Sequence, residues 1–441
     1  MSTLVLPVSD PAATDAGRFG PKGANLAALA QAGMPTPGGF CVDAGAYRRQ
    51  VQALGLEESA RGVFAATDSA QARRHALNMK LGLMDKPIVP ELEEQLLSAW
   101  RQLVSESGTP IAVRSSALVE DRYGSSFAGQ FESFLDLESE TDFLTAVRSC
   151  WAALWMTRAL RYMATHDIDP SETAMGLIIQ PLVKARAAGG ALSQTASGDM
   201  LINATQGLGA AIAQGEVAPE RYLLSREGRH RETVAAPTQY HTMTCEHRPM
   251  LAPRQRKNKD YCLTPAQAEE LGGYLLRAEA LMGRAVEIEW AMDDKGIKML
   301  QSRPLHLEPE ADEHVDDEIW LRQPHLRGQP AGSGWTKGLA CVINCECELA
   351  RVAPGSILVT RMAGPALSQI LPRVAGVVAE LGGSTSHLAS LARERGIPMV
   401  LGADQATIRI PEGSMVAVDG VSGVVRWMKS ETVAPQHARL K

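Results

Sequence analysis

Apolar positions recur with a helical period in the longer, N-terminal part of the chain. Patterns with this spacing cover residues 21–32, 94–106 and 142–164, and each predicts a helix with one buried face. Another helix is predicted to begin at Thr264, because a proline follows at the first helical position and Gln267 stands where a capping box requires it.

Strand-like patterns occur in pairs. The apolar-rich runs 286–292 and 297–303 are separated by Asp293–Gly296, a spacing typical of a β-hairpin. A second hairpin is predicted over Ala191–Ala204, with its turn at a Ser-Gly pair. Because helices and antiparallel strands share one stretch of chain, the sequence predicts a multidomain protein of the α+β or α/β fold class.

Domain boundaries are indicated by composition. Between Glu308 and Glu318 there are seven acidic residues, no Lys or Arg and one Pro, a composition that cannot build a core. A breaker-rich piece, GQPAGSG, follows at 328–334. The predicted organisation is a large unit at 1–307, a linker at 308–334, a small unit at 335–428 and a tail at 429–441.

The composition is that of a globular protein, with 45% hydrophobic and 21% charged residues. A formal net charge of −6 gives no reason to expect nucleic acid as a partner, since its backbone requires concentrated Lys and Arg. No apolar run approaches the roughly 18 residues of a membrane span, and the first residues lack the basic start and apolar stretch of a secretory signal. We therefore expect a cytoplasmic chain that acts on a small molecule and contacts neither nucleic acid nor membrane.

Seven cysteines are an odd and sparse set, so reduced thiols are expected rather than a disulfide framework. Cys341, Cys345 and Cys347 are close in sequence, but no second cluster of metal-ligand spacing accompanies them, and no zinc or iron–sulfur site is predicted there. The GLGAAIAQGE stretch from Gly207 lacks the third glycine of a dinucleotide-binding loop, which argues against a Rossmann domain.

Two short segments indicate phosphate binding. Residues 20–25 (GPKGAN) place Lys22 in a turn before an apolar helix, where a mobile cation and helix N–H groups attract anions. From Ile111 to Phe131, a strand-like IAVR leads into a loop dense in Ser and Gly, and Arg114 supplies a guanidinium at the end of the strand. Taken alone, each segment also fits a solvated surface turn or a mobile loop.

Polar residues on the hairpin at 286–303 point to a metal–nucleotide site. Glu287 and Glu289 share one strand face because they are two residues apart, and Gln301 and Arg303 end the next strand. Carboxylate and amide oxygens suit Mg²⁺, which keeps phosphate contacts of its own, and the guanidinium suits phosphate. A solvated strand face is the alternative interpretation.

The sharpest candidate for chemistry is His387. It follows Gly382, Gly383 and three hydroxyl residues, 384–386, and it precedes an apolar stripe typical of a helix. In the first turn of that helix the dipole favours an anion and disfavours imidazolium, so a neutral imidazole is available as a nucleophile towards phosphorus. A structural role is the usual one for a lone histidine, but this context favours a phosphohistidine.

With these residues in view, the chain resembles the family of phosphoenolpyruvate synthase, pyruvate phosphate dikinase and rifampin phosphotransferase. The resemblance to the family's ATP-grasp nucleotide domain rests on GPKGANLAALAQAGMPTPGGF, IAVRSSA, SSFAGQFESFLDL, LIIQPLV, QGLGAAIAQGEVAPERY, VEIEWAM and LQSRPL. The segment GGSTSHLASLARERGIPMVLG is similar to the swivelling β/β/α phosphohistidine domain of that family. The resemblance implies a two-lobed ATP-grasp domain followed by a small swivelling domain.

The resemblance also implies a reaction, its cofactors and roles for individual residues. ATP, with Mg²⁺, would be cut twice, the β-phosphoryl passing to the histidine while the γ-phosphate is released and AMP is left. The implied roles are phosphate binding by Lys22 and Arg114, a covering loop at Gly129, base or sugar contact by Gln180, Mg²⁺ binding by Glu289 and Gln301, stabilisation of the transferring phosphate by Arg303, and phosphorylation of His387 with Thr385 nearby.

The chain also departs from that family. The synthase and the dikinase carry a pyruvate-binding barrel of about 250 residues after the histidine domain, whereas only 16 residues follow Val425 in this sequence. The rifampin enzyme carries its drug-binding domain between the two units, where this sequence has only the linker. Ala210 and residues 362–369 differ from the usual family residues. We therefore expect neither self-contained phosphoenolpyruvate synthesis nor rifampin modification.

The expected activity is an ATP-dependent phosphotransfer through His387 to a small alcohol or phenol, with a separate acceptor subunit as one arrangement. Two alternatives stay open: a phosphocarrier that passes phosphate to a partner protein, and a degenerate protein that binds nucleotide without chemistry.

Overall fold

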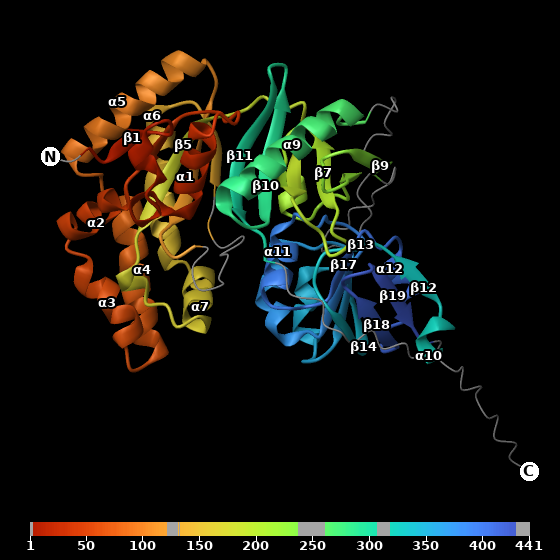
Figure 1. The fold of residues 1–441 in the computed structure, drawn as a ribbon. Coiled ribbons are helices and arrows are strands. Elements are labelled where there is room, and N and C mark those ends of the chain that lie inside the picture. The colour runs from red at the N-terminus through yellow and green to blue at the C-terminus, as the bar shows by residue number, and fades with distance from the viewer. Residues whose placement is uncertain (1–2, 121–130, 132, 237–260, 307–317, 429–441) are drawn as a thin grey trace, which may run out of the picture. The chain divides into compact units, whose positions relative to one another are not determined.

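The computed structural model describes residues 3–120, 131, 133–236, 261–306 and 318–428 (Figure 1). The chain divides into two compact units. The first comprises the described residues of Met1–Ala213, Pro219–Ala236 and Lys259–Leu307, and the second comprises those of Gln214–Ala218 and Glu308–Lys441.

The first unit contains an antiparallel five-stranded sheet with the order β1–β2–β5–β3–β4. Its strands are β1 (Val5–Pro7), β2 (Phe40–Val42), β3 (Ile111–Ala117), β4 (Ser133–Leu137) and β5 (Met175–Pro181). The helices of this part are α1 (Ala16–Gln31), α2 (Ala44–Ala53), α3 (Glu57–Ala65), α4 (Ser69–Asp85), α5 (Pro90–Ser107), α6 (Glu140–Ala152) and α7 (Thr157–Thr165).

Helix α1 is interrupted at Gly20, whose backbone angles are φ 72° and ψ 162°. Pro21 follows and starts the second part of the helix, because its fixed φ suits a first helical position. A Cβ atom on Gly20 would lie 2.3 Å from the carbonyl oxygen of Ser116, so only glycine fits here. The Ser116 hydroxyl accepts a hydrogen bond from the N–H of Gly23 at 3.1 Å. This close approach fixes the start of the helix, and with it Lys22, against strand β3.

A second sheet in the same unit has six strands in the order β11–β10–β6–β7–β8–β9, all antiparallel. The strands are β6 (Ala187–Leu192), β7 (Met200–Gln206), β8 (Glu220–Leu224), β9 (His230–Val234), β10 (Val286–Asp293) and β11 (Gly296–Pro304); the short helix α8 (Ala210–Ala213) follows β7. Helix α9 (Pro265–Met282) packs on this sheet, with Leu271 and Leu275 in one core with Ile288 and Trp290.

Both predicted hairpins are confirmed, and the helix predictions hold in part. Helix α9 begins with the predicted capping box at Thr264. The single helix predicted over 142–164 is wrong, because α6 and α7 are separated by a 3-10 turn and by extended backbone at Met156. At the break the Trp155 indole is buried and donates a hydrogen bond to the Tyr47 hydroxyl at 3.0 Å, a contact that the sequence period does not reveal. Among the described helices, none combines the length and apolar character needed to cross a membrane.

The second unit is built on an eight-stranded sheet with the order β12–β19–β18–β14–β15–β16–β17–β13. Its strands are β12 (His325–Arg327), β13 (Gln329–Pro330), β14 (Trp335–Ile343), β15 (Ile357–Thr360), β16 (Gly376–Ala379), β17 (Met399–Leu401), β18 (Met415–Asp419) and β19 (Val424–Trp427). Strands β14 to β17 run parallel to one another, and α11 (His387–Glu394) connects β16 to β17. This connection is a βαβ unit, so α11 starts at the carboxyl end of a parallel strand. The predicted mixed, multidomain fold class is confirmed.

Two expectations about the C-terminal part differ from the structure. Part of the predicted linker at 308–334 forms α10 (Glu318–Leu321), β12 and β13, because Leu326 and Gln329 are buried in the second unit; residues 308–317 lie outside the described residues. The structure also joins Cys345 and Cys347 in a disulfide, with Cα atoms 5.4 Å apart, where reduced thiols were expected. The four other described cysteines are buried, and Cys245 lies outside the described residues.

The break in α1 is tested by Gly20→Ala. We expect this variant to lose roughly 3 kcal/mol or more of unfolding free energy in urea, because the new methyl group collides with backbone that cannot withdraw. Gly33→Ala is the matched control, since Gly33 has a similar φ of 69° but no atom within 4 Å of the point where a Cβ would lie. That control should lose only about 1 kcal/mol. Equal losses for the two variants would contradict the proposed collision.

Candidate active site

A buried ion pair lies just after the break in α1. The ammonium of Lys22 is 2.9 Å from Oε2 of Glu120, whose side chain has no exposed surface. The other oxygen of Glu120 accepts a hydrogen bond from the N–H of Ala117 at 3.3 Å. Burial raises the pKa of Glu120, while the charge and hydrogen bond of Lys22, the Ala117 N–H and the charge of Arg303 oppose the rise. Sequence reasoning missed Glu120; its only signal was a carboxylate shortly after a buried strand.

The hairpin β10–β11 brings four polar residues to one place. Its register sets Glu287 opposite Arg303 and Glu289 opposite Gln301, with a bulge directly after Glu289. Nη2 of Arg303 donates to Oε1 of Glu287 at 3.0 Å, and both side chains are buried. The predicted sharing of one strand face is therefore confirmed for this set.

Arg114 connects the two sheets of the first unit. It lies on β3, and its Nη1 donates to Oε2 of Glu289 on β10 at 3.0 Å. The Asn25 side chain on α1 makes a further connection, donating to the carbonyl oxygen of Ser302 at 3.0 Å. Because of these bonds, α1, β3 and the hairpin carry Lys22, Arg114 and Arg303 into one cluster of cations, each paired with a carboxylate.

The buried donors without a hydrogen-bond partner among the described residues include Nε of Arg114 and Nε2 of Gln180. Gln180 lies on β5 opposite Ala112 of β3, and only 2% of its surface is exposed. Unsatisfied buried donors are costly, so they point to a ligand that supplies acceptor oxygens or nitrogens. A nucleotide fits this requirement.

The oxygens available for a metal are those of Glu289 and Gln301. The Glu289 side chain is 35% exposed, while Gln301 is mostly buried. No group of three or more acidic, His or Cys ligands occurs within the described parts of the chain. Mg²⁺ binds proteins through one or two oxygen ligands together with water and substrate phosphates, and the carboxylate of Glu289 and the amide oxygen of Gln301 are ligands of that kind.

In the second unit, His387 is the first residue of α11, as the sequence predicts. Ser386 is the N-cap, and its hydroxyl accepts a hydrogen bond from the N–H of Ala389 at 3.3 Å. Ser384, Thr385 and Ser386 are buried, whereas His387 is half-buried and so accessible. The positive end of the helix dipole at this point favours an anion over imidazolium.

A buried arginine fixes the loop before His387. Nη1 of Arg393 donates to the carbonyl oxygen of Ser384 at 2.6 Å, and Nη2 donates to the Ser390 hydroxyl at 3.1 Å. On the other side, Nε2 of Gln329 donates to the Ser384 hydroxyl at 2.7 Å. The loop is thus held from the helix and from strand β13. Sequence reasoning did not predict Arg393 or Gln329, because their partners lie 9 and 55 residues away.

Gly129 lies outside the described residues. Ala363, in the divergent segment 362–369, is buried, and its Cβ lies 3.2 Å from where a Cβ on Gly382 would be. Trp320 and Trp335 form an edge-to-face pair with centroids 6.5 Å apart, which supports a packing role.

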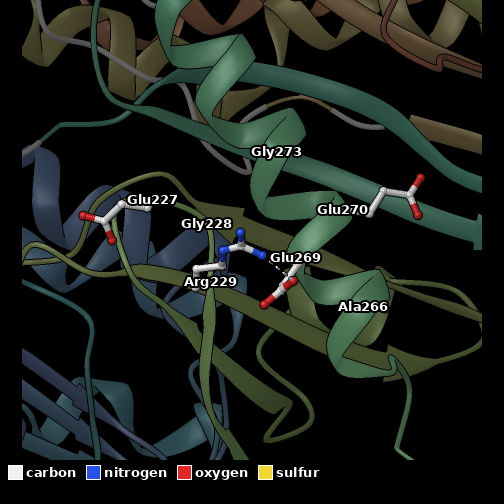
Figure 2. A pocket seen from close by; sticks show the side chains of 7 residues that line it. All are labelled: Glu227, Gly228, Arg229, Ala266, Glu269, Glu270 and Gly273. Carbon is white, nitrogen blue, oxygen red and sulfur yellow. Dashed lines mark ion pairs between the residues drawn. The ribbon is translucent and has the colours of Figure 1, made fainter.

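An open cavity of about 370 Å³ in the first unit lies away from these residues. Figure 2 shows it between the turn that connects β8 to β9 and the exposed side of α9. It is lined by Glu227, Gly228, Arg229, Ala266, Glu269, Glu270 and Gly273. None of the predicted site residues lines it, so it is not the site built from the ion pairs.

Comparison with known proteins identifies the domain that carries the ion pairs. Residues 16–322, more than half of the chain, match the family described as "Pyruvate phosphate dikinase, AMP/ATP-binding domain". The chain belongs to this family. Residues 352–423, which include His387, match a second family described as "PEP-utilising enzyme, mobile domain". The resemblance inferred from the motifs is confirmed, and members of the pyruvate phosphate dikinase family use ATP and Mg²⁺.

Curated relatives from the pyruvate phosphate dikinase family are similar to this chain over nearly the whole length of the chain. A probable phosphoenolpyruvate synthase of Methanothermobacter thermautotrophicus is 31% identical over 93% of the chain and 61% of the relative. The phosphoenolpyruvate synthase of Pyrococcus furiosus is 31% identical over 92% of the chain and 56% of the relative. That of Escherichia coli is 29% identical, with 98% and 58% covered. The chain therefore spans about three fifths of the length of the curated relatives it matches.

The role of Arg393 is tested by Arg393→Gln. We expect this change to lower the free energy of local opening around residues 384–390 by roughly 2–4 kcal/mol, because it leaves buried carbonyl and hydroxyl groups without their charged donor. Amide hydrogen exchange of that peptide measures the loss.

Arg409→Gln is the control for Arg393→Gln. Arg409 is an exposed arginine of the same unit, with one long hydrogen bond of 3.4 Å to the carbonyl oxygen of His325. Its loss should change protection by less than about 1 kcal/mol. Unchanged protection of 384–390 in Arg393→Gln would show that the arginine does not hold the loop.

Proposed function

We propose that this chain is a dikinase-type phosphotransferase that moves the β-phosphoryl group of ATP to His387 and then to an acceptor. The observation that carries the proposal is the set of three paired cations, Lys22, Arg114 and Arg303, on an AMP/ATP-binding domain. An accessible histidine at a helix start in a domain described as mobile supports it. We assign the nucleotide domain to 1–307 and the phosphohistidine domain to 335–428, and the edge strands β12 and β13, from the predicted linker 308–334, belong with the second domain.

The nucleotide residues have distinct tasks in this proposal. Lys22 and Arg114 bind the phosphates, and Gln180 contacts the base or the sugar with its unpaired buried donor. Glu289 and Gln301 hold Mg²⁺, which neutralises charge on the phosphate oxygens when it is bound. Arg303 stabilises the transferring phosphoryl group, whose loose transition state requires positioned positive charge more than covalent help. Gly129 is proposed to lie in the loop that covers the phosphates.

His387 is the only covalent participant in this proposal. A ring nitrogen forms a bond to the β-phosphorus as the P–O bond to the α-phosphate breaks, so AMP leaves. The γ-phosphoryl group is released to water or phosphate. Thr385 and the N–H groups at the start of α11 are assigned the task of stabilising the anionic phosphohistidine. The second unit then carries the group to the acceptor.

The acceptor is proposed to be a small molecule with a hydroxyl or enol oxygen. The relatives are named phosphoenolpyruvate synthases, but about two fifths of their length lies beyond the matched part. A separate acceptor subunit is part of the same proposal.

The half-reaction is tested with ATP labelled at the β-phosphate, Mg²⁺ and no acceptor. We expect AMP to form and one acid-labile label to attach per chain, because a phosphohistidine is hydrolysed by acid. His387→Asn should lose the label and at least roughly 1000-fold of AMP formation, since the nucleophile is gone. His325→Asn, at an exposed histidine on β12 of the same unit, is the control and should keep both. Formation of ADP, or label that persists in His387→Asn, would refute the mechanism.

The metal role is tested by Glu289→Gln. Replacing this charged oxygen ligand by an amide should raise the Mg²⁺ concentration for half-maximal AMP formation on the order of tenfold. Asp294→Asn serves as the control, because Asp294 is in the turn of the same hairpin with a side chain that is 93% exposed. A Mg²⁺ titration that is the same for Glu289→Gln and wild type would exclude Glu289 as a ligand.

A further inference from the structure

The three carboxylates that pair with the phosphate-binding cations differ in exposure. The Glu289 side chain is 35% exposed, that of Glu287 is 6% exposed, and that of Glu120 has no exposed surface. Only the first is open to an incoming metal ion. The most deeply buried of the three has no task in the reaction proposed above.

Both oxygens of Glu120 are already engaged within the protein. One is in the ion pair with Lys22 at 2.9 Å, and the other accepts from the Ala117 N–H at 3.3 Å. The Ala117 bond attaches the carboxylate to the end of β3, the strand that also carries Arg114. Glu120 is thus fixed to the sheet, while its partner Lys22 lies on α1, just after the break at Gly20.

A buried carboxylate is costly to keep. Taking the charge out of water is offset only by good geometry and further hydrogen bonds, so an ion pair of this kind is weak evidence for a stabilising role. A function that needs the lysine in one position explains the cost better. Protein kinases use the same device, in which a glutamate holds the lysine that contacts the nucleotide phosphates.

We propose that Glu120 is a positioning residue that fixes the ammonium of Lys22 at the phosphate end of the nucleotide and stays paired with it when nucleotide binds. In contrast, Glu289 leaves Arg114 and turns to the metal, so that Arg114 becomes available to phosphate. This inference rests on the proposed function, because it assigns Lys22 to the phosphates. It adds a residue that acts through Lys22 and divides the carboxylates into permanent and exchanging partners.

The consequence for catalysis follows from the sign of the charge. Glu120→Gln keeps the shape and an oxygen for the Ala117 N–H but removes the negative charge, and it sets an amide against the ammonium. The affinity of the site for ATP is therefore retained, but Lys22 is no longer held in the position from which it stabilises the transition state. We expect kcat for AMP formation to fall on the order of 10- to 100-fold and the KM for ATP to stay within about threefold.

A second readout reports on Lys22 without any turnover. The rate of reductive methylation of Lys22, measured by peptide mass spectrometry, should rise at least several-fold in Glu120→Gln, because the amine is released from its partner. Glu279→Gln is the matched control. Glu279 forms an ion pair with Arg226 in the same unit, and its loss should change neither the Lys22 rate nor kcat. Glu120→Asp, which keeps the charge, should give values between wild type and Glu120→Gln.

These readouts separate this inference from the proposed function. If wild type forms no AMP, the proposed function fails, and the methylation rate of Lys22 still decides the role of Glu120. An unchanged methylation rate in Glu120→Gln, or a loss of ATP affinity with kcat unchanged, would overturn the positioning role. Should Glu120→Gln not fold, Glu120→Asp gives the decision: a Lys22 rate above wild type supports the role, and a wild-type rate contradicts it.

Discussion

A cluster of cations that binds a triphosphate must not destabilise the folded protein when no triphosphate is bound. Lys22, Arg114 and Arg303 come from three different elements and are mostly buried, so their mutual repulsion is weakly screened by water. The protein resolves this by giving each cation its own carboxylate. This pairing determines where α1, β3 and the hairpin β10–β11 meet, and the rest of the first unit holds that meeting point in place.

The pairing also links structure to reaction. A carboxylate that is buried and doubly engaged remains with its cation, whereas one with exposed oxygen can change partners when a metal ion arrives. In the mechanism that we propose, the site therefore combines fixed positive charge with one exchangeable carboxylate, a combination that suits phosphoryl transfer. In the second unit a buried charged group also fixes a segment: the guanidinium of Arg393 donates a hydrogen bond to the carbonyl oxygen of Ser384 and thereby fixes the loop at the start of α11.

Local features were predictable from the sequence, whereas features that depend on distant contacts were not. The hairpin at 286–303 and the helix start at His387 depend on strand period and on capping by neighbouring residues, and both are found where expected. The motif resemblance, now confirmed, identified the family, but the roles of individual residues stay proposals, since they depend on a bound nucleotide.

The importance of Glu120 comes from its ion pair with Lys22, 98 positions earlier in the chain, and no local pattern distinguishes it from a solvated glutamate. Strands β12 and β13 fall in the predicted linker because short edge strands with Pro and Gly resemble loops until their partners are known. The helix expected at 142–164 is interrupted at Ala153–Met156, where the buried Trp155 indole bonds to Tyr47 of α2, a tertiary contact that periodicity cannot predict.

The central claim is that the nucleotide cations are held by carboxylates and that one carboxylate is exchanged for Mg²⁺ when ATP binds. Calorimetric titration of the wild-type chain with a non-hydrolysable ATP analogue, in Mg²⁺ and in EDTA, tests it most directly. The account predicts affinity at least on the order of tenfold higher with Mg²⁺, and an equal gain in Mg²⁺ affinity when the analogue is bound, because the coupling is reciprocal. An analogue that binds equally tightly in EDTA would contradict the account.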